Sequence, residues 1–363
     1  MRIINIMQDI RPVNMGILSA AINTAIILRN VFNVQSEIWF YGSHHNNTFN
    51  AVEAVALKSR RIKYLKQLVK ERNLDPSTDI IVTHGPWNYQ SFWGNYLAKK
   101  KFKWVFMPHG VLEPCGMKQK WLKKKIYYTL FEKKMLLNAS AIRAISSPEK
   151  KNLEKLFPGR EIILIPNGFD IQTGATAAIT KKNTSFLYLA RLHPLKGATR
   201  LAEAWVASSL NNNSAYSLNI AGPDEGELAK IKILLTQSNN ANYLGTVYNR
   251  EKNELIAAAT FFVLPSLCEG FSISLLETAY AGLIPVITEG CNFPELVQKQ
   301  LAVITGATPK EIQLSLEYCA GLNLQQVNAL SKGVSNYIKS NYSLEIIAQK
   351  QYDLYAGLLS KQY

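Results

Sequence analysis

Short apolar segments that alternate with amphipathic segments constrain the fold of this chain more than any other feature. The apolar segments have the length and composition of buried β-strands, and helical stretches of roughly 10 to 20 residues separate most of them. The alternation predicts βαβ units, which form parallel sheets covered by helices on both faces. The expected strands include residues 2–7, 79–85, 104–110, 162–168, 185–191, 216–222, 260–266 and 283–288.

The length and one polar stretch predict the domain organisation. A chain of 363 residues is long enough for two domains, each with its own core. The stretch DIQTGATAAITKKNT, which begins at Asp170, is polar, rich in Gly and Thr and without periodicity, as linkers are. We therefore expect an α/β protein of two doubly wound, Rossmann-like domains, residues 1–168 and 183–345, with a cleft between them. A helix at residues 346–363 is expected to pack back toward the first domain.

The charge of the chain is strongly basic and unevenly placed. Lys and Arg outnumber Asp and Glu by 41 to 26, for a net charge of +15. Between Lys99 and Lys150, 13 basic residues stand against 3 acidic ones. Such asymmetry indicates nucleic acid, an anionic membrane surface or a phosphorylated substrate. A basic, solvated surface without a ligand explains the same count.

The cellular location is predicted from features that the sequence lacks. No segment approaches the ~18 uninterrupted apolar residues of a membrane span, and the first ten residues have no signal-peptide pattern. The four cysteines form no CxxC pair, which argues against a zinc site and favours a reducing compartment. We expect a cytoplasmic protein.

Two acids in an apolar stretch point to a binding site. Glu269 and Glu277 stand eight positions apart in PSLCEGFSISLLETAYAGLIPVI, where a strand is followed by a turn and a helix that begins near Ser272. The start of such a helix attracts an anion. Carboxylates on either side of the anion suit neutral hydroxyl groups, and a nucleotide sugar has hydroxyls on both sides of a diphosphate. The alternative is that both acids are solvated residues of a turn and a helix.

A diphosphate also requires cations, and the segment LARLHPLKG supplies two. Arg191 follows an expected strand, and Lys196 lies five positions later, before a Gly that opens a helix. Arg can hold two oxygens at once, whereas Lys supplies a compact charge. Both residues can also be ordinary solvated cations, which is the commoner situation of a single Lys or Arg.

Taken together, the motifs resemble those of retaining glycosyltransferases of the GT-B fold, family four, the Glu-x7-Glu type. The resemblance covers the C-terminal domain closely and reaches the N-terminal domain through Gly16 and HGVLEP. The ordered set is far more specific than any one motif. It consists of PNGFD at 166–170, LARLHPLKG at 189–197, IAGPDEGE at 220–227, LG at 244–245 and EGFSISLLETAYAGLIPV at 269–286.

The resemblance implies roles for the four charged residues. Arg191 and Lys196 match the pair that holds the donor diphosphate and stabilises the leaving group. Glu269 matches the first acid of the motif, which faces the transferred sugar, and Glu277 the second, which binds ribose. The resemblance also implies retention of the anomeric configuration. With two cations in place, we expect neither a metal ion nor another cofactor.

The same resemblance implies the remaining expected site residues. Gly270, Phe271 and Ser272 match positions whose backbone amides approach the sugar and phosphate. Gly16 matches a Gly that lets the backbone approach the donor, and His109 a histidine near the donor sugar. His109 can contact the sugar, act as a base or cap the backbone at the end of a strand. The family often has a second Gly where Met15 stands, and Gly and Pro in place of Ser272 and Ser274.

The base of the nucleotide is expected near Gly245–Val247, where backbone groups leave little sequence signal. Val247 is therefore a candidate donor-binding residue, and a UDP-sugar is favoured over a GDP-sugar. The expected acceptor is a saccharide or lipid-linked sugar in bacterial cell-surface polysaccharide assembly. We find no signature of RNA or DNA binding. A GT-B-like nucleotide-sugar epimerase and an inactive nucleotide-sugar-binding protein are the alternatives.

A basic amphipathic stretch suggests a peripheral membrane contact at the inner face of the cell membrane. Residues 117–137, MKQKWLKKKIYYTLFEKKMLL, combine large apolar side chains with seven lysines. That pattern suits an anionic membrane surface. The alternative, which we favour for the apolar side, is a scaffold helix whose apolar stripe belongs to the N-terminal core.

Overall fold

The computed structural model describes residues 1–10, 15–42, 48–49, 52–118, 121–169 and 184–360. The chain divides into two compact units. The N-terminal unit comprises Met1–Gly168 together with Leu344–Tyr363, and the C-terminal unit comprises Phe169–Ser343. The expected linker at 170–183 lies outside the described residues, so its structure stays a prediction.

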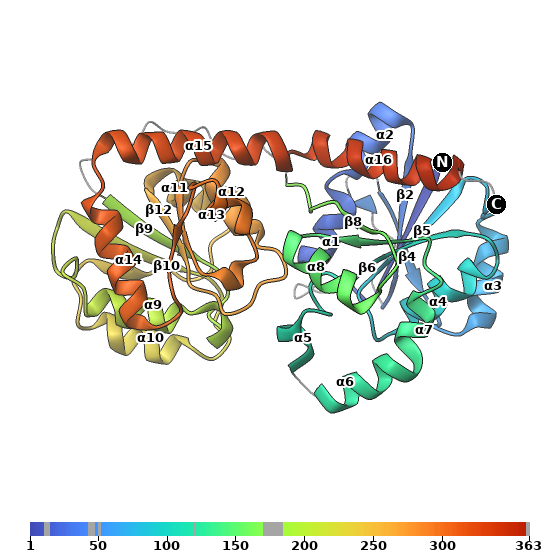
Figure 1. The fold of residues 1–363 in the computed structure, drawn as a ribbon, viewed down its shortest axis with the longest axis horizontal. Coiled ribbons are helices and arrows are strands. Elements are labelled where there is room, and N and C mark those ends of the chain that lie inside the picture. Colours follow the sequence, from blue (N-terminus) through green and yellow to red (C-terminus); the bar gives the residue numbers. More distant parts are fainter. Residues whose placement is uncertain (11–14, 43–47, 50–51, 119–120, 170–183, 361–363) are drawn as a thin grey trace. The chain divides into compact units, whose positions relative to one another are not determined.

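The N-terminal unit is built on a sheet of eight strands in the order β3-β4-β2-β1-β5-β6-β7-β8, in which only β3 is antiparallel to its neighbour. Helices lie on both faces of this sheet (Figure 1). The strands are β1 (Arg2–Met7), β2 (Gln35–Tyr41), β3 (Thr48–Phe49), β4 (Val52–Leu57), β5 (Asp79–His84), β6 (Lys103–Met107), β7 (Ala141–Ala144) and β8 (Ile162–Leu164). The helices between them are α1 (Met15–Ile22), α2 (Ala25–Phe32), α3 (Ile62–Glu71), α4 (Tyr89–Ala98), α5 (Pro114–Lys118), α6 (Trp121–Tyr127), the π-helix η2 (Tyr128–Glu132), α7 (Lys133–Leu136) and α8 (Ser147–Leu156).

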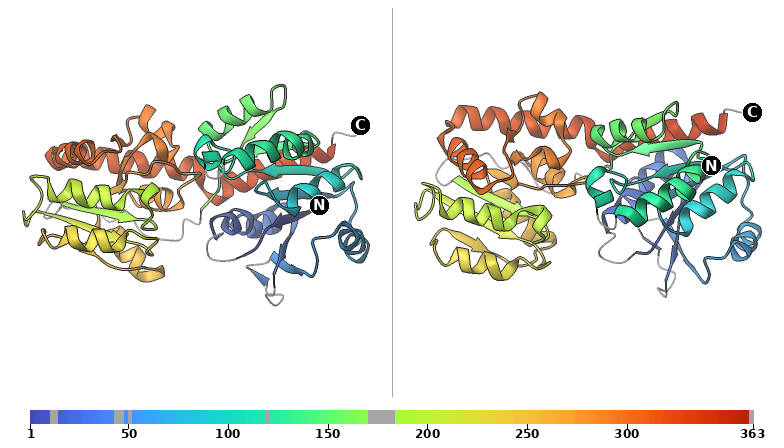
Figure 2. Two further views of the ribbon diagram at one scale, coloured as in Figure 1. Left: turned by 90° about the horizontal axis from the view of Figure 1, so that it is seen from below. Right: turned by 60° about the horizontal axis from the view of Figure 1, so that its bottom comes forward.

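The C-terminal unit has a six-stranded parallel sheet in the order β11-β10-β9-β12-β13-β14. Its helices also cover both faces (Figure 2). The strands are β9 (Thr184–Leu189), β10 (Tyr216–Ala221), β11 (Ala241–Tyr243), β12 (Phe261–Leu264), β13 (Ile284–Ile287) and β14 (Val303–Ile304). The helices are η3 (Pro194–Lys196), α9 (Ala198–Val206), α10 (Leu228–Leu235), α11 (Asn249–Ala258), α12 (Ile273–Tyr280), η4 (Glu289–Cys291), α13 (Pro294–Gln298), α14 (Pro309–Gly321) and α15 (Leu324–Tyr342).

Burial explains why the apolar segments become strands. All residues of β9, β12 and β13 are buried, as expected for central strands of a sheet covered on both faces. The prediction of two doubly wound, Rossmann-like domains is confirmed. The last helix, α16 (Leu344–Ser360), packs on α2 of the N-terminal unit, where the rings of Tyr352 and Phe32 stack with centroids 4.3 Å apart.

The basic amphipathic stretch differs from the expectation. The prediction that its apolar side packs in the N-terminal core is wrong for most of the side chains. No residue of α6 is buried. The large apolar side chains of the segment that are exposed are Trp121, Leu122, Ile126, Leu130, Phe131 and Leu137, whereas Tyr128, Met135 and Leu136 are buried. The amphipathic period alone could not show which apolar residues would find a partner. None of the helices in the described part of the chain could span a membrane.

Candidate functional site

Four adjacent strands of the C-terminal sheet end next to one another, and expected site residues follow three of them. The strand order β11-β10-β9-β12 places the carboxyl ends of parallel strands along one edge. Val247 follows β11, Arg191 and Lys196 follow β9, and Glu269 follows β12. Ligands of open α/β sheets bind outside this edge, where the connections to neighbouring strands diverge.

An ion pair joins two of the expected catalytic residues. Lys196 Nζ donates to Glu269 Oε2 at 2.5 Å, and Ser266 Oγ donates to the other carboxylate oxygen at 2.7 Å. The Glu269 side chain is 6% exposed and that of Lys196 is 16% exposed. The interior strengthens such a pair electrostatically, and removal of one partner leaves the other charge unpaired. Neither Lys196 nor Glu269 is therefore an ordinary solvated side chain.

Backbone contacts fix the two loops that carry the pair. The Leu267 N–H donates to Leu195 O at 2.8 Å, so the loop after β12 is bound to the loop after β9. Gly197 has a φ of +82°, and a Cβ there would lie 2.5 Å from Pro265 O. Only a glycine suits both the left-handed backbone and this close approach. The PLKG sequence thus places Lys196 against Glu269.

Arg191 lies at the same edge with a different partner. Its Nη1 donates to both carboxylate oxygens of Glu225 at 2.6 Å. Glu225 follows β10, in a turn where Asp224 Oδ1 accepts from the backbone N–H groups of residues 226, 227 and 228. Arg191 remains half exposed, with 49% of its side chain accessible. Its guanidinium can therefore still reach a ligand.

The second acid of the Glu-x7-Glu motif, Glu277, lies in α12 and is bound by a second lysine. Lys252 Nζ, from α11, donates to its two carboxylate oxygens at 2.9 and 3.0 Å. The Glu277 side chain is only 19% exposed, so it is not a freely solvated helix residue. Glu269 and Glu277 thus each have a lysine partner from a different element of the same unit.

The turn between the two acids leads into α12. The Ser272 side chain caps this helix by accepting from the Leu275 N–H at 3.3 Å, so the helix begins where the sequence predicted. The Phe271 ring packs against those of Phe293 and Tyr342, and Gly270 is partly buried. These three residues therefore form a fixed turn, whose backbone amides precede the first turn of the helix. Val247 lies in the loop after β11 and packs partly against the core.

The two expected site residues of the N-terminal unit lie on different segments. Gly16 is the second residue of α1. His109 follows β6 with a φ of +55°, and its Nε2 lies 2.9 Å from Nδ1 of His84, the last residue of β5. Burial, aided by the nearby Arg143 charge, lowers the pKa of His109 to about 3. The His109 imidazole is therefore neutral at physiological pH.

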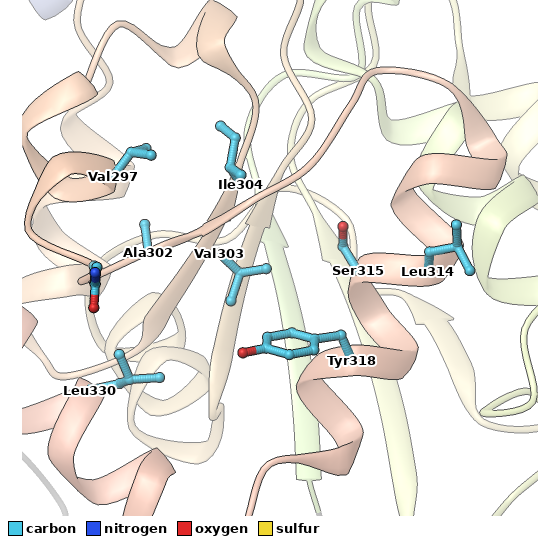
Figure 3. Close-up of a pocket in the computed structure, with 9 residues that line it drawn as sticks. Val297, Ala302, Val303, Ile304, Leu314, Ser315, Tyr318 and Leu330 are labelled. Carbon is cyan, nitrogen blue, oxygen red and sulfur yellow. The ribbon is translucent and has the colours of Figure 1, made fainter.

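Two cavities differ in their position relative to the expected site residues. One of about 190 Å³ lies at the carboxyl edge of the N-terminal sheet and is lined by residues that include Met7, Ile17, His84 and Gln90. Another of about 550 Å³ lies in the C-terminal unit between α13, β14, α14 and α15 (Figure 3). Its lining is mostly apolar and includes none of the expected site residues.

Several residues around the site carried no usable sequence signal. Glu225 and Lys252 bind Arg191 and Glu277 from 34 and 25 positions away. His84 precedes His109 by 25 positions. Of these residues, only Glu225 lies in a motif that the sequence analysis identified, IAGPDEGE. Among the residues that the structure describes, no three His, Cys, Asp or Glu side chains gather as a possible metal site.

Comparison with known protein families accounts for most of the chain. Residues 42–173 match the model described as Glycosyltransferase Family 4, and residues 175–318 match the model described as Glycosyl transferases group 1.

Two curated relatives are distant. A phosphatidylinositol N-acetylglucosaminyltransferase component from Arabidopsis thaliana is 22% identical over 277 residues, which cover 75% of this chain and 60% of the relative. The GDP-mannose:cellobiosyl-diphosphopolyprenol alpha-mannosyltransferase of Xanthomonas oryzae is 27% identical over 236 residues, which cover 61% of this chain and 59% of the relative. The chain thus spans about three fifths of the length of these relatives.

Solved structures share the fold over nearly the whole chain. A glycosyltransferase from Rickettsia africae has a TM-score of 0.77 at 18% identity and covers 99% of both chains. The Anabaena protein HepE, in complex with UDP and glucose, has a TM-score of 0.74 at 17% identity and covers 98% of this chain and all of that chain. This chain is thus built from a Glycosyltransferase Family 4 domain followed by a Glycosyl transferases group 1 domain, in the GT-B fold.

Proposed function

We propose that the protein is a retaining glycosyltransferase that moves a hexose from a nucleoside-diphosphate sugar to a saccharide or lipid-linked acceptor. The observation that carries this proposal is the ion pair of Lys196 with the buried carboxylate of Glu269, with Arg191 at the same sheet edge. A cationic pair beside a helix start suits a diphosphate, and a carboxylate beside it suits sugar hydroxyls.

The proposed chemistry relies on charge that is already in place. Cleavage of the bond to the anomeric carbon leaves positive character on the sugar and negative charge on the departing diphosphate. Lys196 and Arg191 stabilise that growing negative charge, and preorganised groups of this kind usually supply the largest catalytic term. Glu269 holds the lysine and accepts from hexose hydroxyls, while Glu277 accepts from ribose. Because two side-chain cations face the leaving group, the reaction needs no metal ion.

The names of the relatives guide the choice of substrates. The Xanthomonas relative is named for GDP-mannose and a diphosphopolyprenol acceptor, and the Anabaena structure contains UDP and glucose. We therefore propose a UDP- or GDP-linked hexose as donor and a lipid-linked saccharide of bacterial cell-surface polysaccharide assembly as acceptor.

A thermal-shift panel of UDP- and GDP-sugars, with the free nucleotides, tests the donor site. A ligand at 100 times its dissociation constant adds ~2.7 kcal/mol to the free energy of unfolding, which is readily measured. The donor that stabilises the protein is then incubated with a membrane lipid extract. Transfer of the sugar to an extractable product supports the proposal. Binding without turnover would favour the inactive binding protein, and conversion of the donor sugar to an epimer would favour the epimerase.

We also propose that the α6–α7 segment, residues 121–137, binds an anionic membrane surface. Trp121, Leu122 and Ile126 of α6 are more than half exposed. Lys123, Lys125 and Lys134 are exposed in the same segment. Exposed apolar side chains flanked by lysines suit the headgroup region of anionic lipid. Lipid-linked acceptors lie in that surface, so attachment would bring the protein to its substrate.

Vesicle sedimentation tests the membrane surface. The parent should sediment with anionic vesicles at low salt and less at high salt, because each Lys near the surface contributes about 1 kcal/mol. Replacement of Lys123, Lys125 and Lys134 by Glu should abolish this binding. A control with Glu at Lys58, Lys63 and Lys70, which are exposed elsewhere in the N-terminal unit, changes the charge equally and should retain more of it. Equal loss in both variants would show a general charge effect and no defined surface.

A further inference from the structure

Three polar side chains form a chain of contacts across neighbouring strands of the N-terminal sheet. Asn5 lies on β1, His84 ends β5, and His109 follows β6. Asn5 Oδ1 is 3.0 Å from His84 Nε2, and His84 Nδ1 is 2.9 Å from His109 Nε2. Asn5 and His84 are buried, at 5% and 3% exposed. A contact of this length between two ring nitrogens requires a proton on one of them and a lone pair on the other.

The orientation of the Asn5 amide determines where the protons lie. Asn5 Nδ2 donates to Glu37 O on β2 at 3.3 Å, so the amide oxygen is the atom that faces His84. An amide oxygen can only accept, so His84 Nε2 must carry a proton.

Both imidazoles are neutral, which makes this assignment unique. Burial, the His109 ring and the Arg143 charge lower the pKa of His84 well below its usual value. Burial and Arg143 also lower the pKa of His109, to about 3. Arg143 of β7 is fixed beside them, because its Nε and Nη2 donate to Ile165 O and Pro166 O at 2.8 Å. A neutral His84 with a proton on Nε2 has a lone pair on Nδ1. His109 must therefore donate from Nε2, and its own Nδ1 has the remaining lone pair.

The backbone next to His109 is anchored separately. The Gly110 N–H donates to Glu149 Oε1 at 2.5 Å, and the Ile145 N–H donates to Oε2 of the same carboxylate at 2.7 Å. Glu149 lies in α8 and is 1% exposed. Among the described groups, Arg143 is the charge that acts on both rings, Asp9 lines the same cavity as His84, and Glu149 binds the turn after His109. The turn is thus anchored through its backbone, and the His109 ring through its contact with His84.

We propose that Asn5 and His84 are positioning residues that hold His109 as the Nε2–H tautomer and so present its Nδ1 as a hydrogen-bond acceptor for a substrate hydroxyl. The substrate part of this inference rests on the proposed glycosyl transfer. A fixed acceptor selects a sugar that has a hydroxyl at that position over its deoxy analogue, because a buried acceptor left without a donor is costly.

Nitrogen-15 NMR of histidine-labelled protein tests the tautomer without any turnover. The chain has five histidines, and the His109 signals are assigned by their loss in His109→Gln. We expect a proton on Nε2 and none on Nδ1, unchanged from pH 5 to pH 8. A proton on Nδ1, or titration of this ring in that range, would overturn the proposal whether or not the protein transfers a sugar.

Two variants of His84 separate positioning from simple packing. In His84→Gln, the side-chain amide can donate to Asn5 Oδ1 and accept from His109 Nε2, so the His109 tautomer should be kept. In His84→Leu the acceptor is lost, and His109 should populate both tautomers or begin to titrate. If His84→Leu keeps the single Nε2–H tautomer, His84 does not set it. His84→Gln is informative even if His84→Leu fails to fold.

Kinetics then connect the tautomer to the substrate. His84→Leu should lower kcat/KM for the donor by about 3- to 10-fold, as expected for one lost hydrogen bond, and leave nucleoside diphosphate binding unchanged. His84→Gln should restore the parent value. A normal tautomer with no effect of either variant on kcat/KM would refute the substrate role alone, and absence of turnover in the parent would refute the proposed function.

Discussion

Loss of Glu269 and loss of Glu277 should differ in kind, because each carboxylate is assigned to a different part of the donor. Glu277→Ala removes the proposed ribose acceptor, so the free nucleoside diphosphate and the intact donor should both bind less tightly. A hydrogen bond to a charged group is worth ~1.5–3 kcal/mol, so the loss should be about 10- to 100-fold. Calorimetric titration with nucleoside diphosphate measures it.

Glu269→Ala should leave nucleoside diphosphate binding equal or tighter and lower turnover of the donor. The reason is the ion pair: Lys196 Nζ is 2.5 Å from the carboxylate, so the variant leaves an unneutralised ammonium near the diphosphate. Only the intact donor has a hexose for Glu269 to contact, so kcat/KM should fall about tenfold or more.

A matched control is Glu254→Ala, which removes a carboxylate from an exposed position in the same unit. It should change neither quantity. Equal loss of nucleoside diphosphate affinity in Glu269→Ala and Glu277→Ala, or parent-like behaviour of both, would refute the assignment of the two carboxylates to different parts of the donor.

Three further results are expected. Turnover should survive EDTA, because the proposed mechanism relies on side-chain cations and not on a metal ion; loss in chelator that magnesium or manganese restores would contradict this. Burial raises the pKa of Glu149 to about 7, so this acid binds a proton more tightly in the folded state than in the unfolded state. Its contribution to the free energy of unfolding therefore falls as the pH rises from ~4.5 to ~7. Between pH 5.5 and 7, urea unfolding should show the parent losing about 1–2 kcal/mol more than Glu149→Gln, and parallel curves would contradict the assignment. Gly222→Ala should destabilise the folded protein by roughly 2 kcal/mol or more, because the new Cβ would lie 1.8 Å from Ala190 O. The control Gly321→Ala, whose Cβ would meet no atom within 4 Å, should be neutral or stabilising. Equal unfolding midpoints of the two variants would contradict this.

The strand and helix pattern was predictable because burial and periodicity are local properties. The segments at 185–191 and 260–266 became β9 and β12, each shorter at its carboxyl end. The start of α12 was predictable because Ser272 caps the helix with its own side chain. The ends of the strands were less predictable, because a strand ends where its last neighbour in the sheet ends.

The pairing of the site residues was not predictable from the sequence. Lys196 and Glu269 were both expected, but their contact depends on the order of β9 and β12 in the sheet. Glu225 stands in the IAGPDEGE motif, but the motif does not show that it binds Arg191, and Lys252 stands on a segment with no local signal. The exposed apolar side of α6 was also missed, because an amphipathic pattern shows that two faces exist and not which of them is covered.

The most direct test of the account is the rate of nucleoside diphosphate release from the donor by Lys196→Ala. In the proposed mechanism this ammonium stabilises charge that grows only in the transition state, so the variant should lose kcat by about 100-fold or more and lose much less nucleoside diphosphate affinity. Lys230→Ala, at an exposed position of the same unit, should match the parent. A parent-like kcat in Lys196→Ala would contradict the account.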